Sequence, residues 1–387
     1  MSRRPALAAF AGIFVVTMLG LLAVGATLPV LPRYVKGPIG STDLAVGLVS
    51  GAFALTGLAF RPLAGHLADA RGRRLTVIIG ALLSATAGLL YFIPAGVPGL
   101  VVARLVLGAG EGMVFTAGSA WVVDLAPPER RGRLIGLYGL AIWSGLSLGP
   151  PIGELLLHAS SFEVVWAFAA GAPLLGALIA TRIPETFTPR ARGTERAPWL
   201  AREAIRPGLA LSLGVVGFAA VAAFLVLHLD ARGIGHGAVT FAAFAATVVL
   251  VRLVGGDLPD RVGPVPCAIG AALLEALGLV LIGVADSPGV AIAGAMIMGG
   301  AYSTLYPALA VLVVEQVPEY RRGVALGTFT ACFDLGVGLG SPLVGAFVAL
   351  GGYSTAFFGG AACALGAAAV AAFALPRLRT GGEAVPA

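Results

Sequence analysis

The chain has 387 residues, of which 58% are hydrophobic and 11% charged, and its formal net charge is +6. A soluble domain is typically about one quarter charged, so this composition excludes a water-exposed globule with a polar shell. It also excludes a disordered chain, which requires low hydrophobicity and high net charge. Most of the protein surface must therefore face lipid.

Six apolar stretches in the first half are long enough to cross a bilayer, which takes about 20 residues. They cover residues 7–31, 44–64, 75–93, 99–122, 134–157 and 163–181. The first is longer than the apolar core of a signal peptide, so it predicts a span that stays in the protein. Six more follow, at 208–228, 236–255, 265–285, 289–314, 323–350 and 353–375. The sequence therefore predicts an all-α membrane protein with twelve transmembrane helices.

Residues 182–207 separate the two sets of spans. This segment is rich in Arg, Glu and Pro and has little apolar periodicity, which predicts a linker on one side of the membrane. Specific residues also repeat across it at a shift of 191 positions. The matching positions include Arg61 with Arg252, Asp69 with Asp260, Gly72 with Gly263, Arg131 with Arg322 and Gly149 with Gly340.

Duplication of a six-helix unit accounts for this repeat, and parallel repeats of that kind are a transporter architecture. We expect two pseudo-symmetric six-helix bundles. The N-terminal bundle covers residues 1–181, a cytoplasmic linker covers 182–207, and the C-terminal bundle with a short cytoplasmic tail covers 208–387.

The positive charges gather between the spans. All of the 25 basic residues except Lys36 are arginines, and nearly all of them, Arg61 and Arg252 included, fall on one side of the predicted topology. The positive-inside rule assigns that side, with both termini, to the cytoplasm of a cell membrane. The basic composition is thus a topology signal, and no nucleic-acid partner is expected.

The segment after the second span has a distinctive order of residues. It reads Gly65-His-Leu-Ala-Asp69-Ala-Arg71-Gly72-Arg73-Arg74. Gly65 and Gly72 permit tight packing and a sharp turn. Asp69 can stabilise a neighbouring helix N-terminus through its dipole, and Arg73 and Arg74 can pair with acids or lipid headgroups. The plainer interpretation is that these arginines only follow the positive-inside rule.

Two further patterns lie in the fourth and fifth spans. The fourth span reads Arg104-Leu-Val-Leu-Gly108-Ala-Gly110-Glu-Gly112, and the fifth contains Gly145, Gly149, Pro150 and Gly153. Small residues four apart let two helices approach closely, and Pro150 removes one helical hydrogen bond and introduces a bend. Ordinary packing in a glycine-rich chain would give the same spacing.

With the six-plus-six topology, the Gly65 segment resembles the signature loop of the major facilitator superfamily. The Arg104 pattern resembles one that this superfamily associates with proton transfer, and the Gly145 pattern resembles that of its drug and sugar exporters. The resemblance implies the major facilitator fold, a monomer, and a conformational-switch loop of Gly65, Asp69, Gly72, Arg73 and Arg74. It departs from the usual pattern at Ala70, where a basic residue is common, and in the second copy, which lacks the basic pair.

Five charged residues fall within the predicted spans, where an unpaired charge costs at least about 2.5–3.5 kcal/mol. They are Arg104, Glu111, Glu154, Glu275 and Asp334. Desolvation favours the protonated form of a carboxyl and a nearby arginine favours its ionised form, so such a group can act as a proton site. We expect Glu111, modulated by Arg104, and Asp334 to carry proton coupling, with Glu275 as a further candidate. Structural ion pairs are the alternative, and Glu154 is either a gate or a rim residue.

Phe115, Tyr302 and Tyr306 lie on spans four and ten, which line the cavity in the superfamily that the chain resembles; packing is the alternative role. The three cysteines and four histidines show no ligand spacing, so no metal site is expected. The phosphate-binding GxxxxGK[ST] motif and the GxSxG and HExxH motifs are missing, which predicts a protein that is neither an enzyme nor driven by ATP.

The leading hypothesis is a secondary active transporter. It would export small organic or amphipathic molecules in exchange for protons by alternating access, with the proton gradient in place of a cofactor. The few charges within spans argue against a multiply charged substrate. A proton symporter or uniporter for sugar or metabolite uptake fits the same fold, and only the Gly-Pro pattern favours export. A non-transporting membrane sensor would need a soluble signalling domain, for which no stretch of this sequence is long enough.

Overall fold

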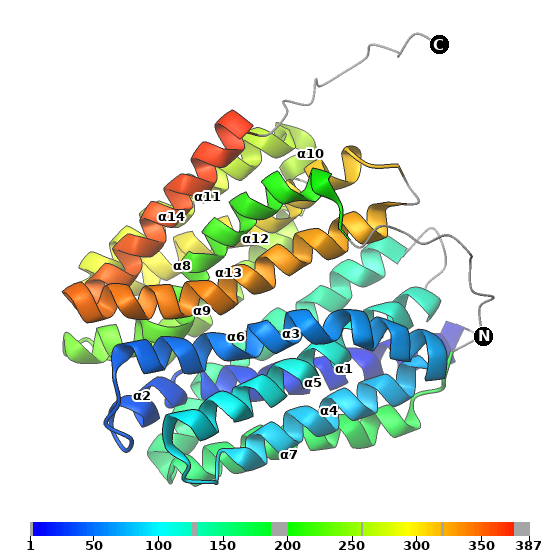
Figure 1. Cartoon of the computed structure of the whole chain (residues 1–387), viewed down its shortest axis with the longest axis horizontal. Coiled ribbons are helices and arrows are strands. Elements are labelled where there is room, and N and C mark those ends of the chain that lie inside the picture. The colour runs from blue at the N-terminus through cyan, green and yellow to red at the C-terminus, as the bar shows by residue number, and fades with distance from the viewer. Residues whose placement is uncertain (1–2, 126–130, 187–199, 257, 319–320, 375–387) are drawn as a thin grey trace.

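The computed structural model describes residues 3–125, 131–186, 200–256, 258–318 and 321–374, and it is all-helical over them, without a strand (Figure 1). The helices of the first half are α1 (Arg3–Thr27), α2 (Val30–Lys36), α3 (Asp43–Arg71), α4 (Arg73–Leu90), α5 (Gly96–Leu125), α6 (Arg131–Ala159) and α7 (Phe162–Arg182). Those of the second half are η2 (Arg202–Ala204), α8 (Ile205–Ala231), α9 (Gly237–Val254), α10 (Leu258–Val262), α11 (Pro264–Val284), α12 (Pro288–Glu315), α13 (Arg322–Gly351) and α14 (Ser354–Ala374).

Twelve segments of the described chain are long and apolar enough to cross a membrane, and each coincides with one predicted span. The first combines α1 and α2, and the seventh combines η2 and α8. Several helices are longer than predicted. The α3 helix continues past residue 64 to Arg71, because backbone hydrogen bonding continues through its polar end until Gly72 turns the chain at a φ of 106°. Of the predicted linker, residues 187–199 lie outside the described part of the chain.

The helices form two bundles that lie against each other (Figure 1). In the first, α1 packs on α6 and α7, and α5 packs on α3 and α4. In the second, α8 packs on α13 and α14, and α11 packs on α12 and α14. The bundles meet mainly where α3 packs on α13 and where α6 packs on α9. The shift of 191 residues relates α3 to α9 and α6 to α13, so these two seams are pseudo-symmetric copies of each other.

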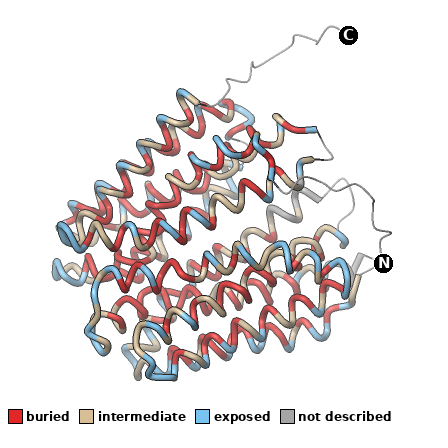
Figure 2. The backbone as a smooth tube through the Cα atoms, in the orientation of Figure 1, coloured by how far each residue is buried: buried red, intermediate tan, exposed pale blue. Residues whose placement is uncertain are grey.

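Both ends of the described chain lie at the same end of the molecule, on the right in Figure 1, which we call the termini side. The opposite end, where α2 lies, is the far side. Buried residues follow the inner faces of the helices (Figure 2). The outer faces carry exposed apolar side chains, among them Leu63, Leu178, Leu250, Leu339 and Phe373. An apolar outer surface over a packed interior is what a bilayer requires.

Candidate functional site

The turn between α3 and α4 carries the first predicted set of site residues. Arg73 is 8% exposed and binds two carboxylates: its Nη1 lies 2.9 Å from Oδ1 of Asp69, and its Nε lies 3.0 Å from Oδ2 of Asp124 on α5. It also donates a 2.6 Å hydrogen bond to the carbonyl of Ala68. Arg73 therefore ties the end of α3 to α5, which is more than the positive-inside rule requires.

The N-terminus of α4 is capped by a residue that the sequence analysis placed in the linker. The carboxylate of Glu185 accepts hydrogen bonds from the backbone N–H groups of Arg73, at 3.2 Å, and Arg74, at 3.0 Å. Asp69, expected to stabilise a neighbouring helix N-terminus, pairs with Arg73, the first residue of α4, and its effect on the helix dipole stays a prediction. No atom outside its own helix lies near the Cα of Gly65, so this glycine is not a packing contact among the described residues.

The seam between α3 and α13 is close-packed on the far side. A Cβ added to Gly51 would lie 2.9 Å from the Cβ of Ser341 and 3.0 Å from the carbonyl oxygen of Gly338. One turn earlier, Gly47 contacts the backbone of Ser341. Small residues on both helices therefore bring the two bundles together backbone to backbone.

An ion pair joins the bundles further along the same seam, towards the termini side. Arg61 on α3 donates to both oxygens of Asp334 on α13, from Nε at 2.7 Å and from Nη2 at 3.0 Å. Asp334 is 5% exposed, whereas the Arg61 side chain is 25% exposed. The guanidinium of Arg61 also lies 5.3 Å from the ring centroid of Phe115. Arg61 was expected to be only a topology charge, so this partner of Asp334 was not predicted from the sequence.

Glu111 lies inside the first bundle at the contact of α5 with α4. Its Oε1 accepts a 3.0 Å hydrogen bond from Ser84, and its buried Oε2 has no partner among the described residues. Gly20 of α1 leaves room for this carboxylate, because a Cβ there would lie 2.7 Å from Oε1.

Arg104 makes no ion pair with Glu111 among the described residues, and its modulation of this carboxyl stays a prediction. Seven residues correspond to about 10 Å along a helix, and Arg104 turns towards α3 instead. It is 1% exposed and donates to the carbonyls of Val49 at 3.2 Å and Ser50 at 3.3 Å. Its guanidinium also lies 4.8 Å from the ring centroid of Phe53. In this structure Arg104 fastens α5 to α3.

Glu275 lies fully buried inside the second bundle, on α11. Neither of its carboxylate oxygens has a hydrogen-bond partner in the described part of the chain. Gly214 and Gly217 of α8 border the group, and a Cβ on Gly217 would lie 2.7 Å from Oε1. Tyr302 of α12 also has a buried hydroxyl that is unpartnered among the described residues.

The repeat relates these two buried carboxyl groups in an unexpected way. The shift of 191 residues places Ser84 on Glu275 and Glu111 on Tyr302. Each bundle thus carries one carboxyl group at the equivalent helix contact, α4 with α5 or α11 with α12. In the first bundle the second helix of the pair, α5, carries it, and in the second bundle the first helix, α11, carries it. This relation is visible in the sequence, because Ser84 matches Glu275 and Glu111 matches Tyr302 at the same shift of 191 residues.

The glycines of the predicted helix bend pack α6 against α1. A Cβ added to Gly145 would lie 2.7 Å from the carbonyl oxygen of Met18, and one added to Gly149 would lie 2.6 Å from the Cα of Gly25. Gly153 contacts the backbone of Ala26. The α6 helix continues through Pro150 and ends at Ala159. These glycines let the proline-containing half of α6 lie directly on α1.

A charged cluster connects the bundles on the far side. Arg33 binds Glu154 of its own bundle at 2.6 Å and Asp230 of the other bundle at 2.8 Å. His158 lies 2.9 Å from the same Glu154. Glu154, expected as a gate or a rim residue, therefore orients an arginine that bridges the bundles.

The aromatic candidates occupy different surroundings. Phe115 stacks on Tyr138 with a centroid distance of 5.9 Å. The hydroxyl of Tyr306 lies 3.1 Å from that of Thr330. Tyr302 is 5% exposed and packs edge-on against Trp143 of the first bundle, at a centroid distance of 5.5 Å. Phe115 and Tyr302 therefore both lie beside a seam.

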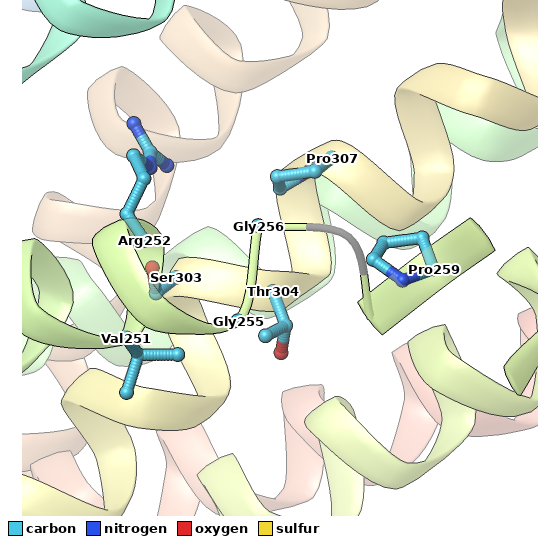
Figure 3. A pocket seen from close by; sticks show the side chains of 8 residues that line it. All are labelled: Val251, Arg252, Gly255, Gly256, Pro259, Ser303, Thr304 and Pro307. Carbon is cyan, nitrogen blue, oxygen red and sulfur yellow. The ribbon is translucent and has the colours of Figure 1, made fainter. Parts of the chain in front are cut away.

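A small cavity of about 20 Å³ lies near the second seam, which is room for about one water molecule. Its lining includes Val251, Arg252, Gly255, Ser303, Thr304 and Pro307 (Figure 3). No group of three or more His, Cys, Asp or Glu side chains that could hold a metal occurs among the described residues.

Comparison with known proteins agrees with this architecture. The family model of the Major Facilitator Superfamily matches residues 13–266 and 227–387. An uncharacterized MFS-type transporter of Salmonella typhimurium is 33% identical over 91% of this chain and 92% of the relative. Another, from Pseudomonas aeruginosa, is 32% identical over 92% of this chain and 90% of the relative.

Two solved structures show the same fold at low sequence identity. The nucleoside transporter NupG superposes with a TM-score of 0.81 at 14% identity, covering 94% of this chain and 99% of that chain. A human organic anion transporter superposes with a TM-score of 0.71 at 20% identity, covering 95% and 99%. The twelve spans in two bundles, the family match over the whole chain and the transporter relatives together show that this chain belongs to the Major Facilitator Superfamily of membrane transporters.

Proposed function

We propose that this transporter exports small organic or amphipathic molecules in exchange for protons, by alternating access between the two bundles. The observation that carries the proposal is the Arg61–Asp334 ion pair, because it spans one seam with two hydrogen bonds and its carboxylate is buried. A proton on Asp334 removes the negative charge that holds Arg61. Protonation and separation of the bundles are thereby coupled.

Glu111 and Glu275 support the same proposal from within each bundle. Neither carboxyl pairs with an arginine among the described residues, and each lies beside a glycine that leaves it space. An unpaired carboxylate is costly at membrane depth, and a bound proton removes that cost. We assign Glu111 and Glu275 as additional proton sites, and Arg104 as a structural fastener.

Alternating access also needs contacts that can break on each side. On the far side, Arg33 links the bundles through Asp230. On the termini side, Arg73, Asp69 and Asp124 link α3 to α5 within the first bundle, so that this bundle can move as one body. The Gly-Pro pattern of α6, packed on α1, favours the export direction through its resemblance to exporters.

The proposed location is the plasma membrane with both termini in the cytoplasm. Arginines such as Arg71, Arg182 and Arg261 lie at helix ends on the termini side, whereas few basic residues lie on the far side. This asymmetry follows the positive-inside rule. We propose a monomer that needs no cofactor besides the proton gradient.

Proteoliposomes with an imposed pH gradient test the proposal. The vesicles contain a pH-sensitive dye, and three probes are offered: glucose, the cation ethidium and the anion 1-naphthaleneacetate. Opposite movement of a probe and protons supports exchange, whereas movement in the same direction indicates symport and would overturn it.

Variants then locate the proton sites. Asp334→Asn and Glu111→Gln should lose gradient-driven flux, while Glu163→Gln, at an exposed carboxyl at the start of α7, should keep it. Normal coupling in both of the first two variants would refute their role.

A further inference from the structure

Arg252 is the pseudo-symmetric counterpart of Arg61. The shift of 191 residues relates the two arginines, and it also relates Trp143 to Asp334. At the first seam an arginine on α3 therefore meets an aspartate on α13. At the second seam an arginine on α9 faces α6, where the matching position is a tryptophan. The two seams thus share the arginine at matching positions, and only the first has an acidic residue opposite it.

Within the described part of the chain, nothing replaces this counter-charge. None of the ion pairs there includes Arg252, and its buried Nε has no hydrogen-bond partner among the same residues. Its Nη1 would lie 3.8 Å from a Cβ at Gly139 on the opposite bundle. The guanidinium thus sits in the seam, and its buried Nε without an acceptor carries a desolvation cost.

The hydroxyl groups nearest to Arg252 in the cavity lining are already engaged in other hydrogen bonds. Ser303 already donates to the carbonyl of Val248 at 2.9 Å, and Thr304 donates to that of Ala301 at 2.8 Å. Figure 3 shows the Thr304 hydroxyl pointing away from the guanidinium of Arg252. Tyr302 directly precedes Ser303, which lines the same cavity as Arg252, and its hydroxyl is unpartnered among the described residues. The Nε of Arg252 and the hydroxyl of Tyr302 therefore each have a proton to donate, and a ligand with acceptor atoms satisfies both.

An apolar surface adjoins these donors. The ring of Tyr302 packs against Trp143 at 5.5 Å, Phe218 at 5.4 Å and Phe244 at 5.8 Å between centroids. Trp143 belongs to the first bundle and the other rings to the second. Separation of the bundles would therefore expose a cation, a phenol and aromatic rings together.

We propose that Arg252, assisted by the hydroxyl of Tyr302, binds the anionic group of the transported substrate, whose apolar part packs on the neighbouring aromatic rings. The substrates are accordingly amphipathic monoanions, with carboxylates as the best fit for a guanidinium. This inference rests on the proposed transport function and names its substrate class.

Binding to the purified full-length protein tests the site apart from transport. Radiolabelled 1-naphthaleneacetate and its uncharged analogue 1-naphthaleneacetamide are compared by equilibrium dialysis. Wild type should bind the acid at least about tenfold more tightly than the amide, the ratio expected for one charge-assisted hydrogen bond. Arg252→Gln should abolish that ratio and Tyr302→Phe should reduce it, while amide binding stays unchanged.

Arg206→Gln is the matched control, because it removes an exposed arginine at the start of α8. It should keep the preference for the acid. Equal binding of acid and amide by wild type, no saturable binding of the acid, or an unchanged ratio in Arg252→Gln would each overturn the inference. Flux of glucose or ethidium without flux of the acid would overturn it and leave the transport proposal standing. Acid binding without gradient-driven flux of any probe would overturn only the transport proposal.

Discussion

Arg61 and Arg252 occupy the same place in the two halves of the chain, yet their surroundings differ. Arg61 is bound at two points by Asp334 across its seam, and Arg252 faces a seam in which Trp143 holds the matching position. A duplicated unit begins with equal seams, so such differences show where the halves have specialised. The first seam carries a closed ion pair suited to a switch. The second carries a cation that has no acidic partner among the described residues and is suited to a ligand.

Removing the counter-charge of the first seam should have the largest effect. Asp334→Ala leaves Arg61 uncompensated in a partly buried position, which should destabilise the protein by about 3 kcal/mol. The midpoint of thermal unfolding in detergent measures this change. The double variant Arg61→Met/Asp334→Leu removes both charges and should recover most of the loss. Equal stability of Asp334→Ala and wild type would mean that the pair is solvated.

The glycines that pack α6 and α13 should differ between the halves. A Cβ at Gly149 would lie 2.6 Å from backbone atoms of α1, whereas a Cβ at its counterpart Gly340 would lie 3.2 Å from a side-chain atom of Val216. Backbone cannot give way easily, so Gly149→Ala should cost about 2 kcal/mol and Gly340→Ala less than about 1 kcal/mol. The two unfolding midpoints provide the comparison, and similar losses would contradict it.

The buried carboxyl groups offer a smaller contrast. Ser84→Ala removes the hydrogen bond to Glu111 and should cost about 1 kcal/mol. Tyr302→Phe removes a hydroxyl that has no partner among the described residues, so stability should change by less than about 0.5 kcal/mol. Unfolding midpoints of the two variants test the contrast. A larger loss in Tyr302→Phe would show that its hydroxyl is bound in solution.

The far-side cluster should contribute least to stability. Arg33 is partly exposed and its carboxylate partners are too, so Arg33→Gln should cost about 0.5 kcal/mol. Arg33→Gln should instead change the conformation, because it removes the ion pair that links Asp230 of the second bundle to the first bundle. A cysteine introduced at Ser147, on α6 at its contact with α9, should react faster with a water-soluble maleimide in the Arg33→Gln background. An unchanged reaction rate would show that this bridge does not hold the far side closed.

The helices could be predicted from the sequence, but many of the side-chain pairs between them could not. Apolar length alone located all twelve spans, because a bilayer fixes how long a helix must be. The partner of Asp334 was missed because Arg61 belongs to the other half of the chain and resembled a topology charge. Arg104 was expected to modulate Glu111, and in the fold it donates hydrogen bonds to backbone carbonyls of α3.

The roles of other residues were not predicted, because they depend on which groups the fold brings next to them. Glu185 looked like part of a polar linker, and only the fold brings it to the N-terminus of α4. Arg252 looked like one more cytoplasmic charge. The difference in its surroundings is nevertheless visible in the amino-acid sequence, because at a shift of 191 residues Arg61 matches Arg252, whereas Trp143 matches Asp334.

The central claim is that the two bundles must separate on the far side during each transport cycle. A variant in which Cys267, Cys332 and Cys363 are replaced by alanine and cysteines are introduced at Arg33 and Asp230 tests this claim with a thiol cross-linker. Cross-linking should stop proteoliposome flux of the probe that wild type transports. A matched pair at Glu163 and Ala167, both exposed on α7, should leave flux intact. Undiminished flux after complete cross-linking of the first pair would contradict the account.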